Sequence, residues 1–221
     1  VVLFACGLVL LGVALVSPLC RLAANLASMH MIQHVILVAV APPLLVLGMR
    51  TDRFARESAA ARMLLARPGR CAAFYGVLIW PWHVPRFYEQ ALLDPRIHLL
   101  MYGSLITAAV LFWTSILSAR DRGAQHGGCA MLALLTTFVH TGLLGALLSF
   151  SPRPWYPLLS ASSTDWGLSP LEDQQLAGLI MWVPMGLVYL LAALWIASCA
   201  LSHPGKRGAE HRPAAQDALI E

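Results

Sequence analysis

The chain has 221 residues, of which 58% are hydrophobic and only 12% are charged, and its formal net charge is +4. Soluble globular domains carry roughly 25% charged residues, so this composition excludes an ordinary soluble enzyme and indicates a membrane protein. The basic excess does not indicate nucleic-acid binding, because arginine beside membrane helices is a topology signal and no aromatic residues interleave with the arginines. We therefore expect a lipid bilayer, and no nucleic acid, as a partner.

Apolar runs of about 20 residues, the length needed to cross a bilayer, divide the chain. They are Val1–Cys20, Leu22–Gly48, His98–Ser118, Cys129–Phe150 and Gln175–Leu201, and a shorter sixth run is Cys71–His83. These lengths suit helices, and the runs lack the alternation of barrel strands. The first run has no signal-peptide cleavage pattern and is expected to be a true helix. The prediction is an all-α polytopic membrane bundle of about six transmembrane helices over residues 1–202, followed by a cytoplasmic disordered tail at 203–221.

The 15 Lys and Arg residues are divided unequally between the two sides of the predicted bundle. Eleven fall on one side, namely Arg50, Arg53, Arg56, Arg62, Arg67, Arg70, Arg120, Arg122, Lys206, Arg207 and Arg212, and four fall on the other, namely Arg21, Arg86, Arg96 and Arg153. Basic residues beside membrane helices are retained on the cytoplasmic side. Both termini are therefore predicted to be cytoplasmic and the loop at 151–174 external.

The third predicted helix, Cys71–His83, is too short for a complete span and meets Pro81 and then Pro85. We expect it to end below the outer interface. The following segment, "RFYEQALL", would then lie along the surface or dip back toward the protein, which implies a depression on the external face.

Five histidines lie in the external half of the predicted bundle and come from four different helices. Counting about 1.5 Å per residue from the cytoplasmic ends, His34, His83 and His140 lie roughly 16 to 21 Å up, and His30 and His98 roughly 27 to 30 Å up. Imidazoles that share a depth inside a membrane indicate a functional site, and imidazole binds copper, zinc, iron and nickel. We predict that all five hold a metal ion, with His34, His83 and His140 around a common centre.

Methionines add a mild preference for copper, because thioether sulfur favours Cu(I). Met29, Met31, Met101 and Met181 all fall in the external half. Two alternatives stay open: a b-type haem held by His34 and His140 in an electron-transfer protein, and a scaffold in which the histidines have no role. A proton or ion transporter is disfavoured, because such relays use intramembrane carboxylates.

Several motifs together resemble the CtaG-type cytochrome c oxidase assembly family, whose members are associated with caa-type oxidases. The matching stretches are "SP" at Ser17 and Pro18, "HMIQHVIL" followed by "APPLLVLG", "WHVPRFYEQAL", the His98 region ending in "LFW", the His140 helix, and "LEDQQLAGLIMWVP". The resemblance implies a non-enzymatic factor of the bacterial inner membrane that helps to build cytochrome c oxidase, with copper as the metal handled and oxidase subunits as partners. It also implies that the five histidines, with Asp173 and Gln174, belong to the family's pattern. The family pattern places a helix ahead of the position where this chain begins, and it leads us to expect an uncharged segment where Arg21 stands.

Overall fold

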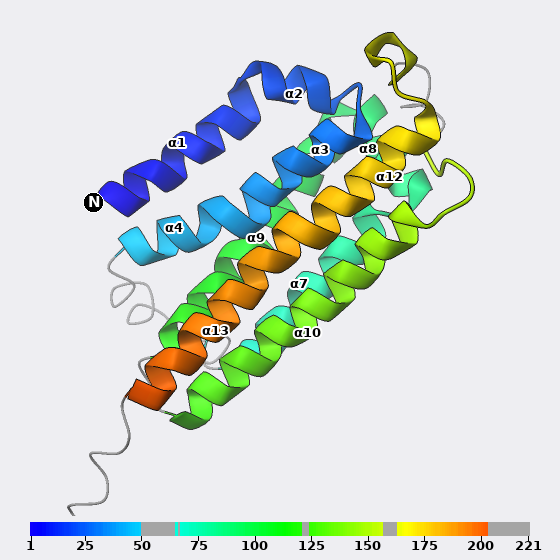
Figure 1. Ribbon diagram of the computed structural model, residues 1–221. Coiled ribbons are helices and arrows are strands. Elements are labelled where there is room, and N and C mark those ends of the chain that lie inside the picture. The colour runs from blue at the N-terminus through cyan, green and yellow to red at the C-terminus, as the bar shows by residue number, and fades with distance from the viewer. Residues whose placement is uncertain (50–64, 66, 121–123, 157–162, 203–221) are drawn as a thin grey trace, which may run out of the picture.

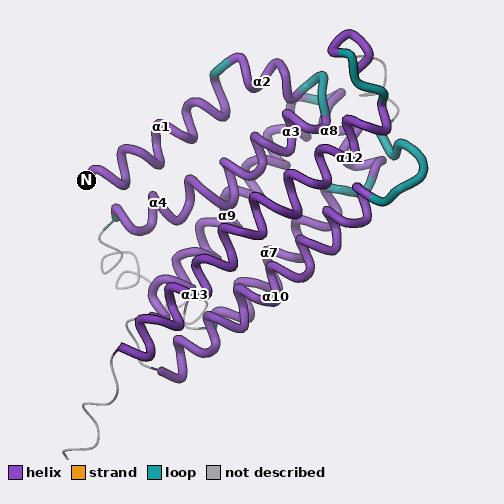
Figure 2. The backbone as a smooth tube through the Cα atoms, viewed as in Figure 1, coloured by secondary structure: helices purple, strands orange, loops and turns teal. Residues whose placement is uncertain are grey.

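The computed structural model describes residues 1–49, 65, 67–120, 124–156 and 163–202. The predicted tail at 203–221 and most of the basic loop before Pro68 lie outside the described residues. Within the described part, the chain is helical and contains no strand (Figure 2). The expected all-α membrane bundle is therefore confirmed.

The helices pack side by side as an elongated bundle (Figure 1). In chain order they are α1 Val2–Val16, α2 Pro18–Ala23, α3 Ala27–His34, η1 Val35–Val40, α4 Ala41–Gly48, α7 Pro68–Trp82, α8 Pro85–Leu93, α9 Pro95–Arg120, α10 Ala124–Ser149, η2 Thr164–Trp166, α12 Pro170–Ile180, η3 Met181–Met185 and α13 Gly186–Ser202. Helix α1 packs on α4 at the edge of the bundle, and α10 packs against both α12 and α13.

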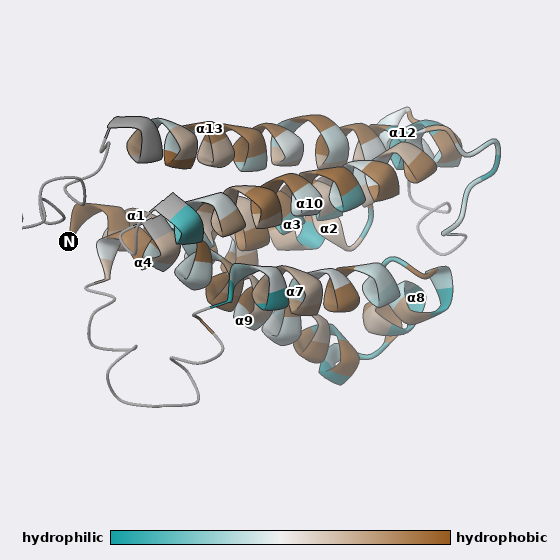
Figure 3. Cartoon of the chain, turned by 90° about the horizontal axis from the view of Figure 1, so that it is seen from below, coloured by the Kyte–Doolittle hydropathy of each residue, from teal (hydrophilic) through white to brown (hydrophobic). Residues whose placement is uncertain are grey.

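Four continuous segments of the described residues are long and apolar enough to cross a bilayer: Ala27–Gly48, Pro95–Ala119, Gln125–Ser149 and Pro170–Cys199. Helices α1 and α7 have 15 residues each, fewer than the roughly 20 that a full crossing needs. Figure 3 shows apolar colours along the long helices and hydrophilic colours gathered near α8 and the start of α12. A count of six crossings therefore stays a prediction.

The first apolar run is broken, so the single helix expected over Val1–Cys20 is wrong. Helix α1 ends before Ser17, and the Ser17 hydroxyl accepts a hydrogen bond from the Leu19 N–H at 3.2 Å to cap α2. Pro18 has no N–H to donate to the preceding turn, whereas it suits the first position of a new helix. The short α8 after α7 is the separate segment that the prolines of "WPWHVP" predicted.

Two of the long helices contain a π-helical segment, and a proline accompanies each one. Segment η1 lies directly before α4, whose second and third residues are Pro42 and Pro43, and η3 contains Pro184. A proline inside a helix has no N–H and its ring crowds the carbonyl four residues earlier, so the regular hydrogen-bond ladder must widen or break there. The Val38 carbonyl, which would face Pro42 in a regular helix, instead accepts the indole N–H of Trp113 at 3.0 Å. The two π segments contact each other inside the bundle.

Glycines allow α10 and α12 to approach closely. A Cβ placed on Gly178 would lie 2.5 Å from the Gly145 carbonyl oxygen, and one placed on Gly145 would lie 2.8 Å from the Gly178 carbonyl oxygen. Backbone atoms cannot move aside as a side chain can. This crossing therefore fixes the position of α12, whose first turns reach the histidine cluster.

Candidate metal site

Four of the five predicted histidines lie in one cluster at the end of the bundle where α8 packs. The ring centroids of His30 and His34 are 4.5 Å apart, and those of His34 and His83 are 5.9 Å apart. Tyr102 joins His98 to this group, with its ring 4.3 Å from His98 and 6.1 Å from His30. His30, His34 and His83 are at most 5% exposed, whereas His98 is half-buried.

Backbone carbonyls determine which ring nitrogen carries the proton in His83 and His98. The Nδ1 atom of His83 lies 2.8 Å from the Ile79 carbonyl oxygen, and Nδ1 of His98 lies 3.1 Å from the Ala91 carbonyl oxygen. Because a carbonyl oxygen only accepts, each Nδ1 must carry the proton in the neutral ring. The Nε2 lone pair of each ring is then available to a metal ion, and the carbonyl fixes the orientation of the ring, as is usual for metal-ligating histidine.

The other two rings leave buried nitrogens without partners. Neither ring nitrogen of His30 makes a hydrogen bond of good geometry to a described residue, although the Ala23 backbone lies near this ring, and Nε2 of His34 makes none. Buried polar atoms nearly always have a hydrogen-bond partner, so these nitrogens are candidate positions for a water molecule or an ion. A metal ion would satisfy the lone pairs of such nitrogens.

Gln33, between the two histidines of α3, ties three helices together. Its side chain is fully buried, and its Nε2 donates to the Ala14 carbonyl of α1 at 2.7 Å. Its Oε1 accepts the hydroxyl proton of Tyr102 at 2.7 Å. Gln33 thus holds α3 in register with α1 and α9, and its role is to position the histidines rather than to bind.

Asp173 anchors the start of the helix that carries His30 and His34. Its carboxylate, 2% exposed, accepts the N–H of Ala27 at 2.7 Å, the N–H of Ser28 at 3.1 Å and the Ser28 hydroxyl at 2.5 Å. The first N–H groups of a helix have no partner within it, and the helix dipole favours a negative charge there. The buried carboxylate is therefore satisfied by α3 and fixes it against α12.

Gln174, the neighbour of Asp173, anchors the connection that follows α10. Its Oε1 accepts the N–H of Trp155 at 2.5 Å, and its Nε2 donates to the Leu148 carbonyl at 3.3 Å. Tyr156, which follows Trp155 in the chain, donates its hydroxyl proton to the His83 carbonyl at 2.9 Å. Burial raises the pKa of the Tyr156 phenol above its ordinary value, so this donor stays protonated.

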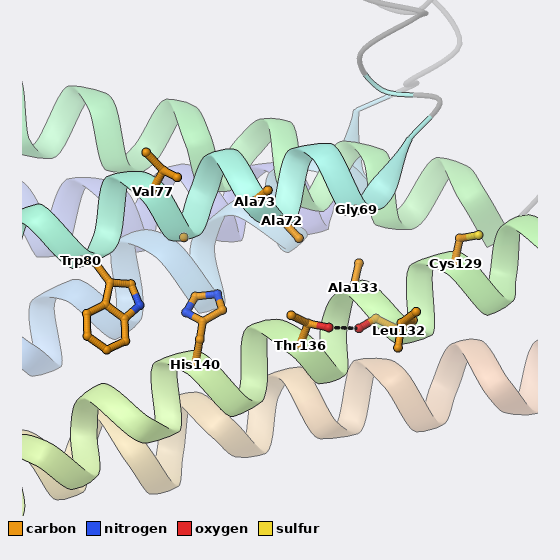
Figure 4. Close-up of a pocket in the computed structure, with 11 residues that line it drawn as sticks. Gly69, Ala72, Ala73, Val77, Trp80, Cys129, Leu132, Ala133, Thr136 and His140 are labelled. Atoms are coloured by element: carbon orange, nitrogen blue, oxygen red, sulfur yellow. Dashed lines mark hydrogen bonds between the residues drawn. The ribbon is translucent and has the colours of Figure 1, made fainter.

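Within the described residues, no ring contact joins His140 to the other four histidines. It lines an open, mainly apolar groove of about 700 Å³ between α7 and α10, together with Gly76, Trp80 and Thr136. Figure 4 shows its ring extending from α10 toward α7 beside Trp80. Both of its ring nitrogens are without a hydrogen bond.

Among the described residues, ring contacts join His34 to His30 and to His83, and none joins His140 to them, so a common centre of His34, His83 and His140 stays a prediction. Within the described residues, no group of three His, Cys, Asp or Glu side chains is close enough to hold a metal ion by itself. Metal binding by the five histidines stays a prediction.

Three tyrosines of the cluster were not predicted. The ring of Tyr88 lies 4.8 Å from His30 and 4.7 Å from Tyr156, and Tyr102 contacts three histidine rings. Tyr102 follows His98 by four residues on one helix face, a spacing from which its contact was predictable. Tyr156 lies in a connection without helical periodicity, and no signal in the sequence indicates its contact with His83.

A comparison with known families finds that the profile described as cytochrome c oxidase caa3 assembly factor matches residues 1–201. No curated protein and no solved structure gives a significant match. The match covers nearly the whole chain and confirms the resemblance in its motifs. The chain belongs to the cytochrome c oxidase caa3 assembly factor family.

Proposed function

We propose that this caa3 assembly factor binds a copper ion among His30, His34, His83 and His98 and passes it to a subunit of the oxidase. The observation that carries the proposal is the group of buried imidazole nitrogens without hydrogen bonds. Imidazole is a good ligand for copper, and family membership connects the chain with an enzyme that is being assembled. Binding and transfer of an ion need no catalytic group, so the proposed role is not enzymatic.

An external groove offers access to the cluster. It has a volume of about 480 Å³ and is lined by Ala91, Leu92, Leu93, Pro95, His98, Leu99 and Tyr102. His98 forms part of its wall, and ring contacts lead from His98 through Tyr102 to His30 and then to His34. This order supports entry or exit of the ion at the end of the bundle where α8 lies.

Metal analysis of the full-length protein in detergent tests the proposal. Replacing both His30 and His34 by Ala removes the central rings and should abolish most of the copper that the wild-type protein binds. The His126→Ala variant, which changes a histidine near the other end of α10, should bind copper as the wild type does. Circular dichroism should show the same helix content in all three proteins. Equal copper in the double variant and the wild type would reject the site.

A visible spectrum of the same purified protein distinguishes the haem alternative. A copper carrier without haem shows no Soret band. A stoichiometric Soret band that is lost in a His140→Ala variant would favour haem and count against the copper proposal.

A further inference from the structure

A small chamber in the histidine cluster is lined by two histidines and three methionines. It has a volume of about 10 Å³ and is lined by Met31, His34, Val38, Ile79, His83, Leu105, Met181 and Met185. The three methionines are at most 6% exposed, and the two histidines are 5% exposed. All five of these side chains are therefore buried inside the bundle.

We propose that this chamber is a binding site for a cuprous ion, with His34, His83, Met31, Met181 and Met185 as the available donors. The inference rests on the proposed function and adds to it the oxidation state of the ion and the place where it is held. Thioether sulfur is a soft donor that selects Cu(I), whereas ions such as Mg²⁺ or Ca²⁺ require oxygen ligands. No oxygen-bearing side chain lines the chamber.

The size and chemistry of the chamber suit an ion better than a water molecule. A volume of about 10 Å³ is close to the minimum for one water molecule, which also needs two to four polar partners. The two imidazoles, His34 and His83, meet only the lower limit of this number. A Cu(I) ion, in contrast, can use the lone pairs of nitrogen and sulfur together.

Charge also favours the singly charged ion. The cost of burying an ion rises steeply with its charge, and it must be offset by nearby opposite charge or by good ligands. No carboxylate lines the chamber, and Asp173 is already bonded to the first residues of α3. A divalent ion would therefore keep its full double charge in an apolar environment, whereas Cu(I) brings only one.

The prolines that widen the two helices also position the donors. Met181 and Met185 are the first and last residues of η3, and Met31 and His34 lie in the last turn of α3, directly before η1. A π-helical turn changes the direction in which the side chains after it point, and such turns are frequent at functional sites. The two interrupted helices contact each other at η1 and η3.

The test is a competition titration of the full-length protein in detergent with Cu(I), under anaerobic reducing conditions, against a chromophoric Cu(I) chelator. The double variant Met181→Leu/Met185→Leu removes two sulfurs and nearly preserves the side-chain volume. We expect its Cu(I) affinity to fall by roughly tenfold or more, since loss of even an indirect partner of a metal ligand costs about 10- to 100-fold. The control is Met101→Leu, which changes a fully buried methionine outside the chamber and should leave the affinity unchanged.

X-ray absorption at the copper edge gives a second readout that does not depend on folding of the variant. The wild-type protein should show sulfur as well as nitrogen neighbours around Cu(I). If copper binds with nitrogen neighbours alone, and the double variant binds it as tightly as the wild type, the chamber is not the site although the proposed function survives. If the wild type binds neither Cu(I) nor Cu(II), both the proposed function and this inference are wrong.

Discussion

At the scale of single residues, the candidate site is held in place by hydrogen bonds from residues that are not among the proposed ligands. Gln33 and Tyr102 connect α3 to α9, Tyr156 holds the backbone of His83, and Asp173 holds the start of α3. Each partner fixes the backbone that carries a histidine. Loss of one of them should therefore weaken metal binding without removing a donor.

The Asp173→Ala variant tests this role. It removes three hydrogen bonds from the first residues of α3 and leaves buried N–H groups without partners, which should cost roughly 2 kcal/mol or more of stability. Copper binding should weaken along with it. Thermal unfolding in detergent measures the stability, and Asp165→Ala, at an exposed position, should be neutral. If the two variants proved equally stable, Asp173 would have no anchoring role.

His140 shows what a sequence can predict about a residue in a membrane helix. Counting residues gives its depth, and it was expected to meet His34 and His83 at about the same level. Depth does not determine which face of a helix points inward, because that depends on which neighbours the helix packs against. Helix α10 turns His140 toward α7, where its ring lines a groove together with Gly76 and Trp80.

At the scale of elements, the positions of the long helices follow from apolar runs, but their interruptions follow from prolines. Pro18 ends the first run, and Pro42, Pro43 and Pro184 accompany the π segments. The sequence shows the prolines without showing the resulting change in helix geometry. Met185 was missed as a candidate donor for this reason, since its direction depends on η3.

The Pro184→Ala variant tests the link between the π segment and the chamber. Alanine restores an N–H and favours a regular α-helix, so Met185 should turn away from Met181 and the other donors. We expect an unchanged or higher unfolding temperature together with roughly tenfold weaker Cu(I) binding. Pro170→Ala, at the first position of α12, should change neither property, because the N–H there has no helical partner in any case. Unchanged Cu(I) binding in Pro184→Ala would show that the π segment is not needed for the site.

The crossing of α10 and α12 should tolerate no side chain at Gly178. Alanine there would press on the backbone of Gly145 and should cost about 1 to 3 kcal/mol. At Gly128, where a Cβ would meet nothing within 4 Å, alanine should be neutral or stabilise by up to about 1 kcal/mol. Thermal unfolding in detergent compares the two variants. A stable Gly178→Ala protein would show that the helices can separate without cost.

At the scale of the whole molecule, composition and apolar runs were sufficient to predict an all-α membrane bundle. In lipid, a backbone must satisfy its own hydrogen bonds, and apolar runs of this length can do so only as helices. The family motifs were equally informative, because "HMIQH" and "LEDQQ" lie where α3 and α12 contact each other, and "APP" opens α4, which packs on α1 and α9. The number of complete crossings was less predictable. Helices α1 and α7 are short, and length alone does not show how such helices sit in a bilayer.

The orientation of the bundle in the membrane is predicted from the division of basic residues, eleven against four. Single cysteines at Asp165 and Gln125, both exposed, can report it once the five native cysteines have been replaced. In intact cells, an impermeant maleimide should label the cysteine at 165 and spare the one at 125. Labelling at 125 alone would show the opposite orientation, with the histidine cluster on the cytoplasmic side.

The most direct test of the central claim is the copper content of the oxidase in cells of the native host that carry the His30→Ala/His34→Ala variant. The proposal predicts that the oxidase polypeptides reach the membrane but contain little copper and have little activity. Cells with the His126→Ala variant should have oxidase with normal copper. A fully active, copper-replete oxidase in cells that hold the double variant at normal levels would contradict copper delivery and leave a scaffold as the better account.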